Sequence, residues 1–465
     1  MRKKHLFMFT LTTSFLIITL ISCHFNFPSS ALSDRSGTKT MDHDAISSAI
    51  EAESTSEYPS STATKDTPLH VETEQLLPTA TMTATEMINE EDEPLPDPTA
   101  TQSSEPEPPV VYGPDNFPDH INPLTGMPVE NTDWLYLPPA LLSISNFPAS
   151  ARPQSGLNSS PLTFEIAIGE GMTRFLAMFY GSFPAFASGQ TEGASPGLPS
   201  DSPEGLGPIR SGRMSYEGIR ASYHGFLVMA SAYSGVAQNL QGSTSIFGSD
   251  SDDINSALIG VDKLHEIALA QQKDPEKRPY LDGLMFAEKA PGGSAAADML
   301  WVFYSNLNQI QWRYNPEIGA NIRSDIKTDG SQEFVQSTDR LTGDPLTKEN
   351  VIVMYVEHEF LAPTLIDINL FNIPPRKALL YRDGQVYEIF WTTRFGEHEK
   401  ETGLLRPIRF VDDQGNPFPL KPGQTWVHIV TESSYHVEST ISPTPFHPIV
   451  PQEGTGLWLV RFRGQ

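Results

Sequence analysis

Between residues 140 and 326 the chain alternates short apolar runs with polar turns, and the spacing of its apolar positions changes along the way. Apolar runs bounded by turn residues predict β-strands, and apolar residues three and four apart predict helices. The pattern predicts strands at 140–146, 162–169, 173–180 and 225–232, helices at 214–224 and 252–272, and a β-meander at 299–305, 309–315 and 319–326. Residues 113–336 are therefore expected to form a mixed α/β domain.

After about residue 337 the helical spacing disappears. Apolar and polar residues alternate through NVIVMYVEHEF, KALLYRDGQVYEIFWTTR, IRFVDDQGNPFPL and TWVHIVTE, a pattern that with its RDGQ and DQGN turns is typical of antiparallel hairpins. Residues 337–450 are expected to form a smaller β-rich domain, followed by a tail at 451–465. The expected fold class is α+β or mixed α/β, with an N-terminal mixed α/β domain and a β-rich C-terminal domain, since about 350 residues exceed one typical domain.

The first 22 residues have the layout of a secretory signal peptide. Three basic residues at positions 2–4 precede an uncharged, mainly apolar run at 6–21, which is short for a membrane span. The run closes in Leu-Ile-Ser-Cys, which resembles the lipobox of bacterial lipoproteins, and Cys23 is the only cysteine, so it has no internal disulfide partner. We expect cleavage before Cys23 and attachment of lipid such as palmitate. An uncleaved anchor helix is the alternative.

Residues 23–112 differ in composition from the rest of the chain. Ser, Thr, Pro and acidic residues dominate, and between Asp34 and Glu107 there are 17 acidic and 3 basic residues, a net charge of −14 out of −26 for the whole chain. Such a segment buries too little apolar surface to offset the entropy lost on ordering, so a disordered, extended tether is expected. The signal contributes +3, which leaves −15 on the remainder. An acidic folded part without clustered Lys and Arg argues against nucleic acid as a partner.

A concentrated set of polar residues lies at the ends of the predicted strands. Glu165 and Glu170 could form an acid/base pair of the kind glycosidases use, although side chains five apart on one strand face opposite sides. Alternatively, these carboxylates pair with nearby arginines, or the arginines line a cleft for a carboxylate or phosphate on a cell-wall polymer. All three interpretations stay open, and no catalytic residue is assigned. The candidate ligand-binding residues are Arg152, Gln154, Glu165, Glu170, Arg174, Arg210 and Arg213.

Neither a metal site nor a cofactor site is predicted. Glu-His-Glu occurs at 357–359 and 397–399, but in a strand the histidine and the glutamates point to opposite faces, so solvated strand residues are the better interpretation. The chain has no HExxH or Walker A sequence. A core position is expected for Trp301, Trp312, Trp391 and Trp426.

Several blocks of sequence resemble one known family. NPLTGMPV (122–129), ARPQSGL (151–157), FEIAIGEGMTRFLAMFY (164–180) and GPIRSGR (207–213) are similar to the YerB-like lipoproteins, called domain of unknown function 3048, and the blocks at 337–355, 378–391 and 420–430 are similar to the family's C-terminal domain. The resemblance implies a membrane-anchored lipoprotein. It implies no activity, because none is established for the family. Met229 departs from the pattern, because a histidine is usual at that position.

These observations favour an extracytoplasmic, lipid-anchored protein of the cell envelope with a binding or scaffolding role. The alternative is an enzyme, a cell-wall hydrolase or transferase that uses Glu165 or Glu170. The expected partners are the membrane, through the lipid on Cys23, and peptidoglycan or another envelope polymer or protein, with no nucleic acid and no cofactor.

Overall fold

The computed structural model describes residues 110–184, 205–246, 257–371, 374–393, 397–440 and 449–464. The chain divides into two compact units, Met1–Thr99 and Ala100–Gln465, and all described residues lie in the second. The predicted signal peptide, Cys23 and nearly all of the predicted tether lie outside the described residues. Within the described ranges, no helix is long and apolar enough to cross a membrane.

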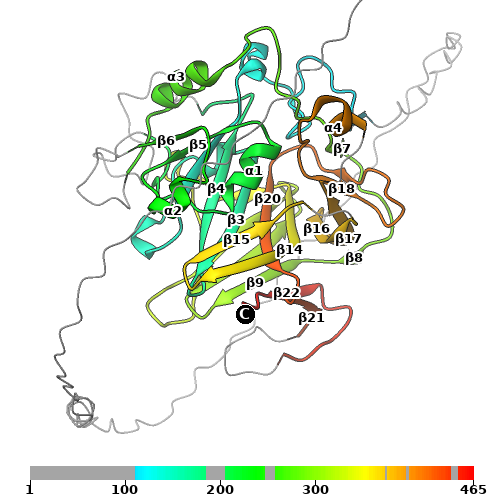
Figure 1. Cartoon of the computed structure of the whole chain (residues 1–465). Helices are drawn as coiled ribbons and strands as arrows, with labels where there is room; N and C mark the ends of the chain where they lie inside the picture. Colours follow the sequence, from blue (N-terminus) through cyan, green and yellow to red (C-terminus); the bar gives the residue numbers. More distant parts are fainter. Residues whose placement is uncertain are drawn as a thin grey trace, which may run out of the picture. The chain divides into compact units, whose positions relative to one another are not determined.

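A large twisted β-sheet runs through the second unit (Figure 1). Counted over the described residues, it has 12 strands, ten of which follow one another across the sheet. They are β18 (Arg409–Val411), β17 (Gln385–Thr392), β16 (Arg376–Arg382), β14 (Asn350–Ala362), β20 (Thr425–Thr431), β3 (Leu162–Gly169), β4 (Met172–Phe179), β2 (Ala140–Ser145), β5 (Phe226–Met229) and β6 (Ser243–Ser245), with β15 (Leu365–Asn369) beside β14 and β8 (Ala295–Ala296) beside β17.

A second sheet packs against one face of the first. In the described part of the chain it has seven strands: β12 (Phe334–Gln336), β11 (Ala320–Ile326), β10 (Asn308–Asn315), β9 (Met299–Ser305), β22 (Leu457–Arg461) and β21 (Tyr435–Glu438) in order, with β13 (Thr347–Lys348) beside β11. The predicted meander of β9, β10 and β11 is confirmed. The residues expected to form a C-terminal tail contain β22, which runs parallel to β9 inside this sheet.

The remaining elements are short. A small third sheet joins β1 (Val111–Tyr112), β7 (Met285–Ala287) and β19 (Pro419–Leu420). The helices are α1 (Tyr216–Ser222), α2 (Ser234–Ala237), α3 (Val261–Gln271) and α4 (Glu397–Thr402), and the 3-10 turns are η2 (Thr132–Tyr136), η3 (Ala149–Ala151) and η4 (Leu157–Ser159).

Apolar side chains fill both faces of the large sheet. Trp426, on one face, contacts Phe175 of the same sheet and Trp312 of the second sheet. On the opposite face, Phe164 belongs to the same apolar cluster as Tyr216 of α1. The strands of the large sheet are therefore buried on both sides, which explains their nearly continuous apolar sequences. All four tryptophans expected in the core are buried, namely Trp301, Trp312, Trp391 and Trp426.

The predicted fold class is wrong. Strands make up 41% and helices only 12% of the interpretable part of the chain, so the protein is mainly β rather than α+β or mixed α/β. The helix expected at 252–272 is described only as α3, at Val261–Gln271, and residues 252–256 lie outside the described part. Strands of two to five residues, such as β7, β13 and β19, show too few alternations to be detected by pattern, so the β content was underestimated.

Strands from both sides of residue 336 share the large sheet. β20 lies between β14 and β3 and runs parallel to both, pairing Val427 with Ile352 and with Phe164. The antiparallel hairpin at the RDGQ turn is confirmed as β16 and β17. Parallel pairing between distant segments was not predicted, because hairpin signals report only neighbouring strands. The domain boundary at 336/337 stays a prediction.

Candidate functional site

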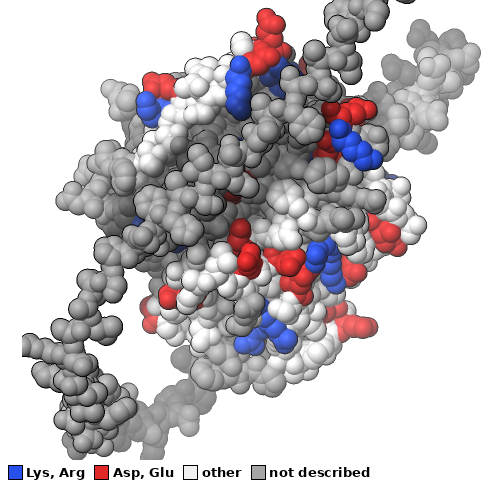
Figure 2. All heavy atoms as spheres, viewed as in Figure 1, with Lys and Arg blue, Asp and Glu red and all other residues white. Residues whose placement is uncertain are grey.

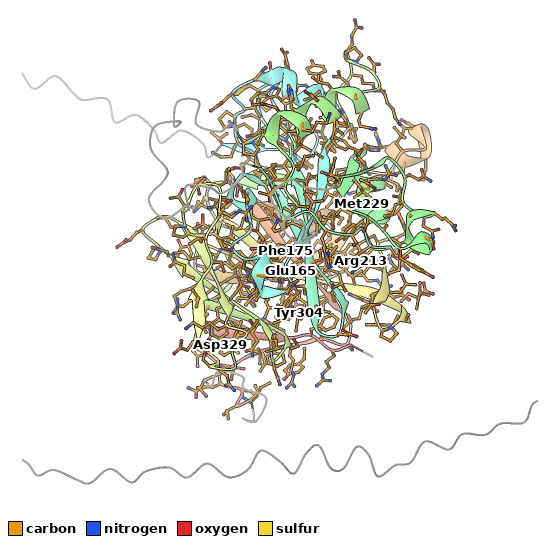
Figure 3. All side chains as sticks on the ribbon, turned by 90° about the vertical axis from the view of Figure 1, so that its left-hand side faces the viewer. Glu165, Phe175, Arg213, Met229, Tyr304 and Asp329 are labelled. Carbon is orange, nitrogen blue, oxygen red and sulfur yellow. The ribbon has the colours of Figure 1, made fainter. Side chains whose placement is uncertain are left out.

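Glu165 lies in the interior, between the two large sheets (Figure 3). Its carboxylate accepts hydrogen bonds from Thr173 Oγ1 at 2.8 Å, Arg323 Nη1 at 2.8 Å and Trp426 Nε1 at 3.1 Å. Both oxygens are thus engaged, and the side chain is fully buried. The carboxylate pairs with an arginine, as one of the three interpretations predicted, but this arginine is Arg323, which was not among the candidate residues.

Arg323 is the centre of this buried network. It also donates two hydrogen bonds to Asp325, at 2.8 and 3.1 Å, and its guanidinium lies 4.6 Å from the ring centre of Trp426 and 5.2 Å from that of Phe175. Although burial opposes the charged form, Asp325 and Glu165 raise the pKa of Arg323. Burial likewise favours a neutral Asp325, but Arg323 holds the pKa of that carboxyl well below its usual range.

His428 completes the network as a neutral ring. Trp312 Nε1 donates to His428 Nε2 at 2.8 Å, so the ring proton belongs on Nδ1, which faces Glu165 at 3.4 Å and the Tyr304 hydroxyl at 3.3 Å. Burial lowers the pKa of His428 to about 4, against an attraction by Glu165. The contact between His428 and Glu165 is therefore not an ion pair at neutral pH.

Glu170 occupies a different environment. It is exposed in the turn that joins β3 to β4, with a φ of 53° between Gly169 and Gly171, which also have positive φ. A tight turn of this kind needs residues in the left-handed region. The Glu165 carboxylate is enclosed whereas the Glu170 carboxylate points to solvent, so the two do not flank a common substrate. The acid/base pair considered from the sequence therefore does not form.

Three of the predicted arginines come together on the opposite face of the large sheet. Side chains alternate along β4, so Arg174 points away from the face that carries Thr173 and Phe175. Arg174 donates from Nη1 to the Ser211 carbonyl at 2.8 Å, which brings it to the loop that carries Arg210 and Arg213. We call Arg174, Arg210 and Arg213 the arginine cluster.

The loop of the arginine cluster is held by backbone hydrogen bonds. Arg210 donates its N–H to the Ser143 carbonyl of β2 at 2.7 Å, and its own carbonyl accepts from Ala230 at 3.0 Å, so the loop lies between the ends of β2 and β5. A side chain at Gly212 would come within 2.5 Å of the sulfur of Met229. The loop can approach β5 this closely because position 212 is glycine.

The electrostatics of the arginine cluster are unusual for cations that are buried or half-buried. Burial is the largest cause that lowers the pKa of Arg174 to about 10, and Arg213 and Arg210 contribute to the same decrease. Burial and Arg210 also lower the pKa of Arg213. Over the described part of the chain, no carboxylate forms an ion pair with any of the three, and the Nε–H of each is buried without a hydrogen-bond acceptor. By contrast, basic side chains on the face in Figure 2 lie beside acidic ones.

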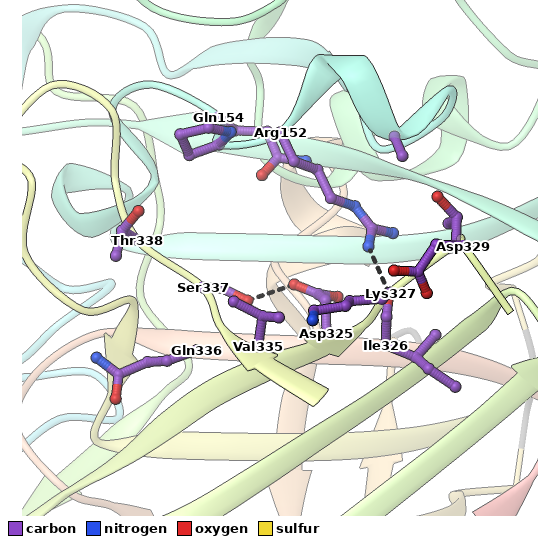
Figure 4. A pocket seen from close by; sticks show the side chains of 13 residues that line it. Arg152, Gln154, Asp325, Ile326, Lys327, Asp329, Val335, Gln336, Ser337 and Thr338 are labelled. Atoms are coloured by element: carbon purple, nitrogen blue, oxygen red, sulfur yellow. Dashed lines mark hydrogen bonds between the residues drawn. The ribbon is translucent and has the colours of Figure 1, made fainter. Parts of the chain in front are cut away.

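Arg152 and Gln154 line a separate cleft of about 410 Å³ (Figure 4). Arg152 donates from Nε to Asn146 at 3.0 Å and from Nη1 to the Ile326 carbonyl at 3.4 Å, while Gln154 donates to the Ser145 carbonyl at 3.1 Å. The walls carry both signs of charge, because Asp325, Lys327 and Asp329 also line the cleft. The predicted polar set is therefore divided between the interior, the arginine cluster, this cleft and an exposed turn.

The two Glu-His-Glu triplets differ. Residues 357–359 lie on β14 as expected, with both glutamates exposed. Residues 397–399 begin α4 instead of a strand, and Glu399 is buried against Arg406 and Arg409, so the expectation of solvated strand residues is wrong there. Among the described residues, no group of three His, Cys, Asp or Glu side chains is arranged to hold a metal ion.

Comparison with known families matches both halves of the described chain. Residues 124–267 match the N-terminal domain, and residues 300–427 the C-terminal domain, of a family described as "Protein of unknown function (DUF3048)". The chain belongs to this family. The resemblance seen in the sequence is thereby confirmed. Within the DUF3048 ranges, the N-terminal match contains Glu165 and the arginine cluster, and the C-terminal match contains Arg323.

One curated relative within DUF3048 is "Putative lipoprotein YerB" of Bacillus subtilis, strain 168. It is 25% identical over 328 residues, which span 67% of this chain and 86% of YerB. A crystal structure of the YerB protein from Bacillus subtilis matches with a TM-score of 0.49 and 23% identity, over 67% of this chain and 96% of that chain.

Proposed function

We propose that this protein is a lipid-anchored binding protein on the extracytoplasmic face of the cell membrane. The support comes from the basic and apolar segments at the N-terminus, the Leu-Ile-Ser-Cys sequence that ends at Cys23, and the description of YerB as a lipoprotein. The long acidic segment that follows is suited to hold the folded part away from the membrane surface, since like charges keep a chain extended.

The arginine cluster is the proposed binding site, and its ligand is an anionic group on an envelope polymer or protein. The observation that carries the proposal is that three guanidinium groups gather without a carboxylate partner in the described part of the structure. Gathering like charges in a partly buried place costs free energy that an anion would recover. Guanidinium groups bind carboxylate and phosphate oxygens through paired hydrogen bonds, so either group suits the site.

Arg210→Ala or Arg213→Ala is expected to weaken binding of inorganic phosphate or acetate at least about ten-fold, because each change removes charge-assisted hydrogen bonds worth about 1.5–3 kcal/mol. Isothermal titration calorimetry of the full chain at low ionic strength would measure this. The thermal unfolding midpoint should change little, since neither arginine has a carboxylate partner among the described residues.

Arg220→Ala is the matched control for this measurement. Arg220 lies nearby on α1 and is already paired with Glu217 at 2.6 Å, so its loss should leave anion binding unchanged. Equal binding by wild type, Arg210→Ala and Arg213→Ala would refute the site.

Cys23→Ala is expected to abolish incorporation of labelled palmitate and to leave an unprocessed or soluble exported protein, because Cys23 is the only cysteine available for lipid. Metabolic labelling followed by membrane fractionation would measure both effects. Cys23→Ala protein that still carries the label would end the proposal of a lipid anchor.

A further inference from the structure

A groove of about 680 Å³ lies between η2 and the exposed side of α3, away from the residues of the arginine cluster. Its walls combine aromatic rings with amides and carboxylates. Its lining residues include Asp133, Trp134, Tyr136, His265, Gln272 and Glu276.

The aromatic wall of the groove is rigidly held. The ring of Trp134 meets Phe183 edge to face at 6.1 Å and His265 at 6.3 Å, and Phe183 and His265 contact each other at 5.4 Å. Tyr136 is fixed by the guanidinium of Arg278, 4.9 Å from its ring centre. A platform whose rings are already ordered loses little conformational entropy when a ligand stacks on it.

The helix wall presents one face of α3 to the groove. His265, Leu269 and Gln272 are spaced so that they share that face, and Leu269 remains 51% exposed. Gln272 donates from its side chain to the Tyr136 carbonyl at 3.0 Å, which ties the end of α3 to η2 and sets the width of the groove.

The charged side chains of the groove indicate which kind of ligand it can bind. Asp133 and Glu276 are exposed and form no ion pair among the described residues, and no lysine or arginine belongs to the lining. Anionic ligands are therefore disfavoured, which separates this groove from the arginine cluster. What the groove offers is aromatic faces beside hydrogen-bond acceptors and donors.

We propose that this groove binds neutral sugar rings of an envelope glycan. The C–H groups of a pyranose carry a partial positive charge that is attracted to the negative face of an aromatic ring, and its hydroxyl groups donate hydrogen bonds to carboxylates and amides. Trp134 provides the stacking face, and Asp133 accepts hydroxyl hydrogen bonds at the rim. The cavity is within the size range of small-molecule sites. The proposal does not rest on the function proposed for the arginine cluster.

An oligosaccharide titration of the full chain tests the proposal. β-1,4-linked N-acetylglucosamine trimers and tetramers are expected to bind and to change the tryptophan fluorescence, and Trp134→Ala should weaken that binding at least ten-fold. Asp133→Ala should weaken binding several-fold. Because Asp133 is exposed and its loss leaves the aromatic contacts intact, this variant keeps the test valid if Trp134→Ala fails to fold. Trp458→Ala, on β22, is the control that should bind the oligosaccharides as wild type does.

Two results would overturn the proposal. The first is that the oligosaccharides do not bind, or that they bind Trp134→Ala and Asp133→Ala as tightly as wild type. The second is that spermidine, a cationic amine, binds the groove and the sugars do not, since aromatic rings beside carboxylates also attract cations.

Discussion

Glu165→Ala is expected to lower the free energy of unfolding by about 3–5 kcal/mol, the cost of breaking a buried ion pair from one side. Arg323 would keep Asp325 but lose the partner that it contacts at 2.8 Å in the interior. Thr173 and Trp426 would also lose their acceptor. Urea unfolding at neutral pH, followed by tryptophan fluorescence, would measure the change.

Glu170→Ala is the control, because Glu170 is exposed in the turn between β3 and β4. Its effect should stay within about 0.5 kcal/mol, as for most surface substitutions. If Glu165→Ala were as stable as Glu170→Ala, the buried network would not hold the two sheets together. The Glu165 carboxylate would then again be a candidate catalytic group.

Acidification is expected to destabilise the protein by way of His428. Burial lowers the pKa of His428 from about 6.5 in the unfolded chain to about 4 in the folded protein, so the unfolded chain takes up the proton first as the pH falls. The contribution of His428 to stability is therefore complete above about pH 6.5 and is lost as the pH falls towards 4. A difference of this size between the pKa values of His428 in the folded and unfolded protein corresponds to about 3 kcal/mol in the free energy of unfolding.

His428→Gln should remove this part of the pH dependence. The amide oxygen of glutamine can still accept the hydrogen bond from Trp312, so packing is disturbed as little as a substitution allows. Urea unfolding of both proteins between pH 7 and pH 4 gives the comparison, and carboxylates that titrate in both proteins cancel. Parallel stability curves for wild type and His428→Gln would show that the ring does not titrate in this way.

The sequence predicted strands better than it predicted their arrangement. β3, β4, β9, β10 and β11 were located because alternating or continuous apolar runs between turn residues are local signals. The parallel contacts of β20 with β14 and β3 join segments far apart along the chain, and no local signal encodes such pairing. For the same reason the sequence predicts only a tail at 451–465, where β22 runs parallel to β9.

The candidate site was predicted in part. Arg174, Arg210 and Arg213 were singled out together, and the structure does bring them together. Glu165 was also singled out, but its partner Arg323 is 158 residues away in sequence, beyond what spacing can connect. A weaker signal was present, because Arg323 and Asp325 are two apart on a predicted strand and so share a face. Trp134 and the groove beside α3 were not predicted, because Trp134 lies outside every predicted strand and helix and no local pattern marks it.

Cosedimentation with purified cell-wall sacculi tests the central claim most directly, because it presents envelope polymer to the whole protein. Wild-type protein and Arg220→Ala are expected to pellet with the sacculi at low salt and to be released as ionic strength rises, since screening weakens contacts between exposed charges. The double variant Arg210→Ala/Arg213→Ala, with an unfolding midpoint like that of wild type, should show markedly less retention at low salt. If the folded double variant pellets as fully as wild type and is released at the same salt concentration, the arginine cluster is not the envelope-binding site.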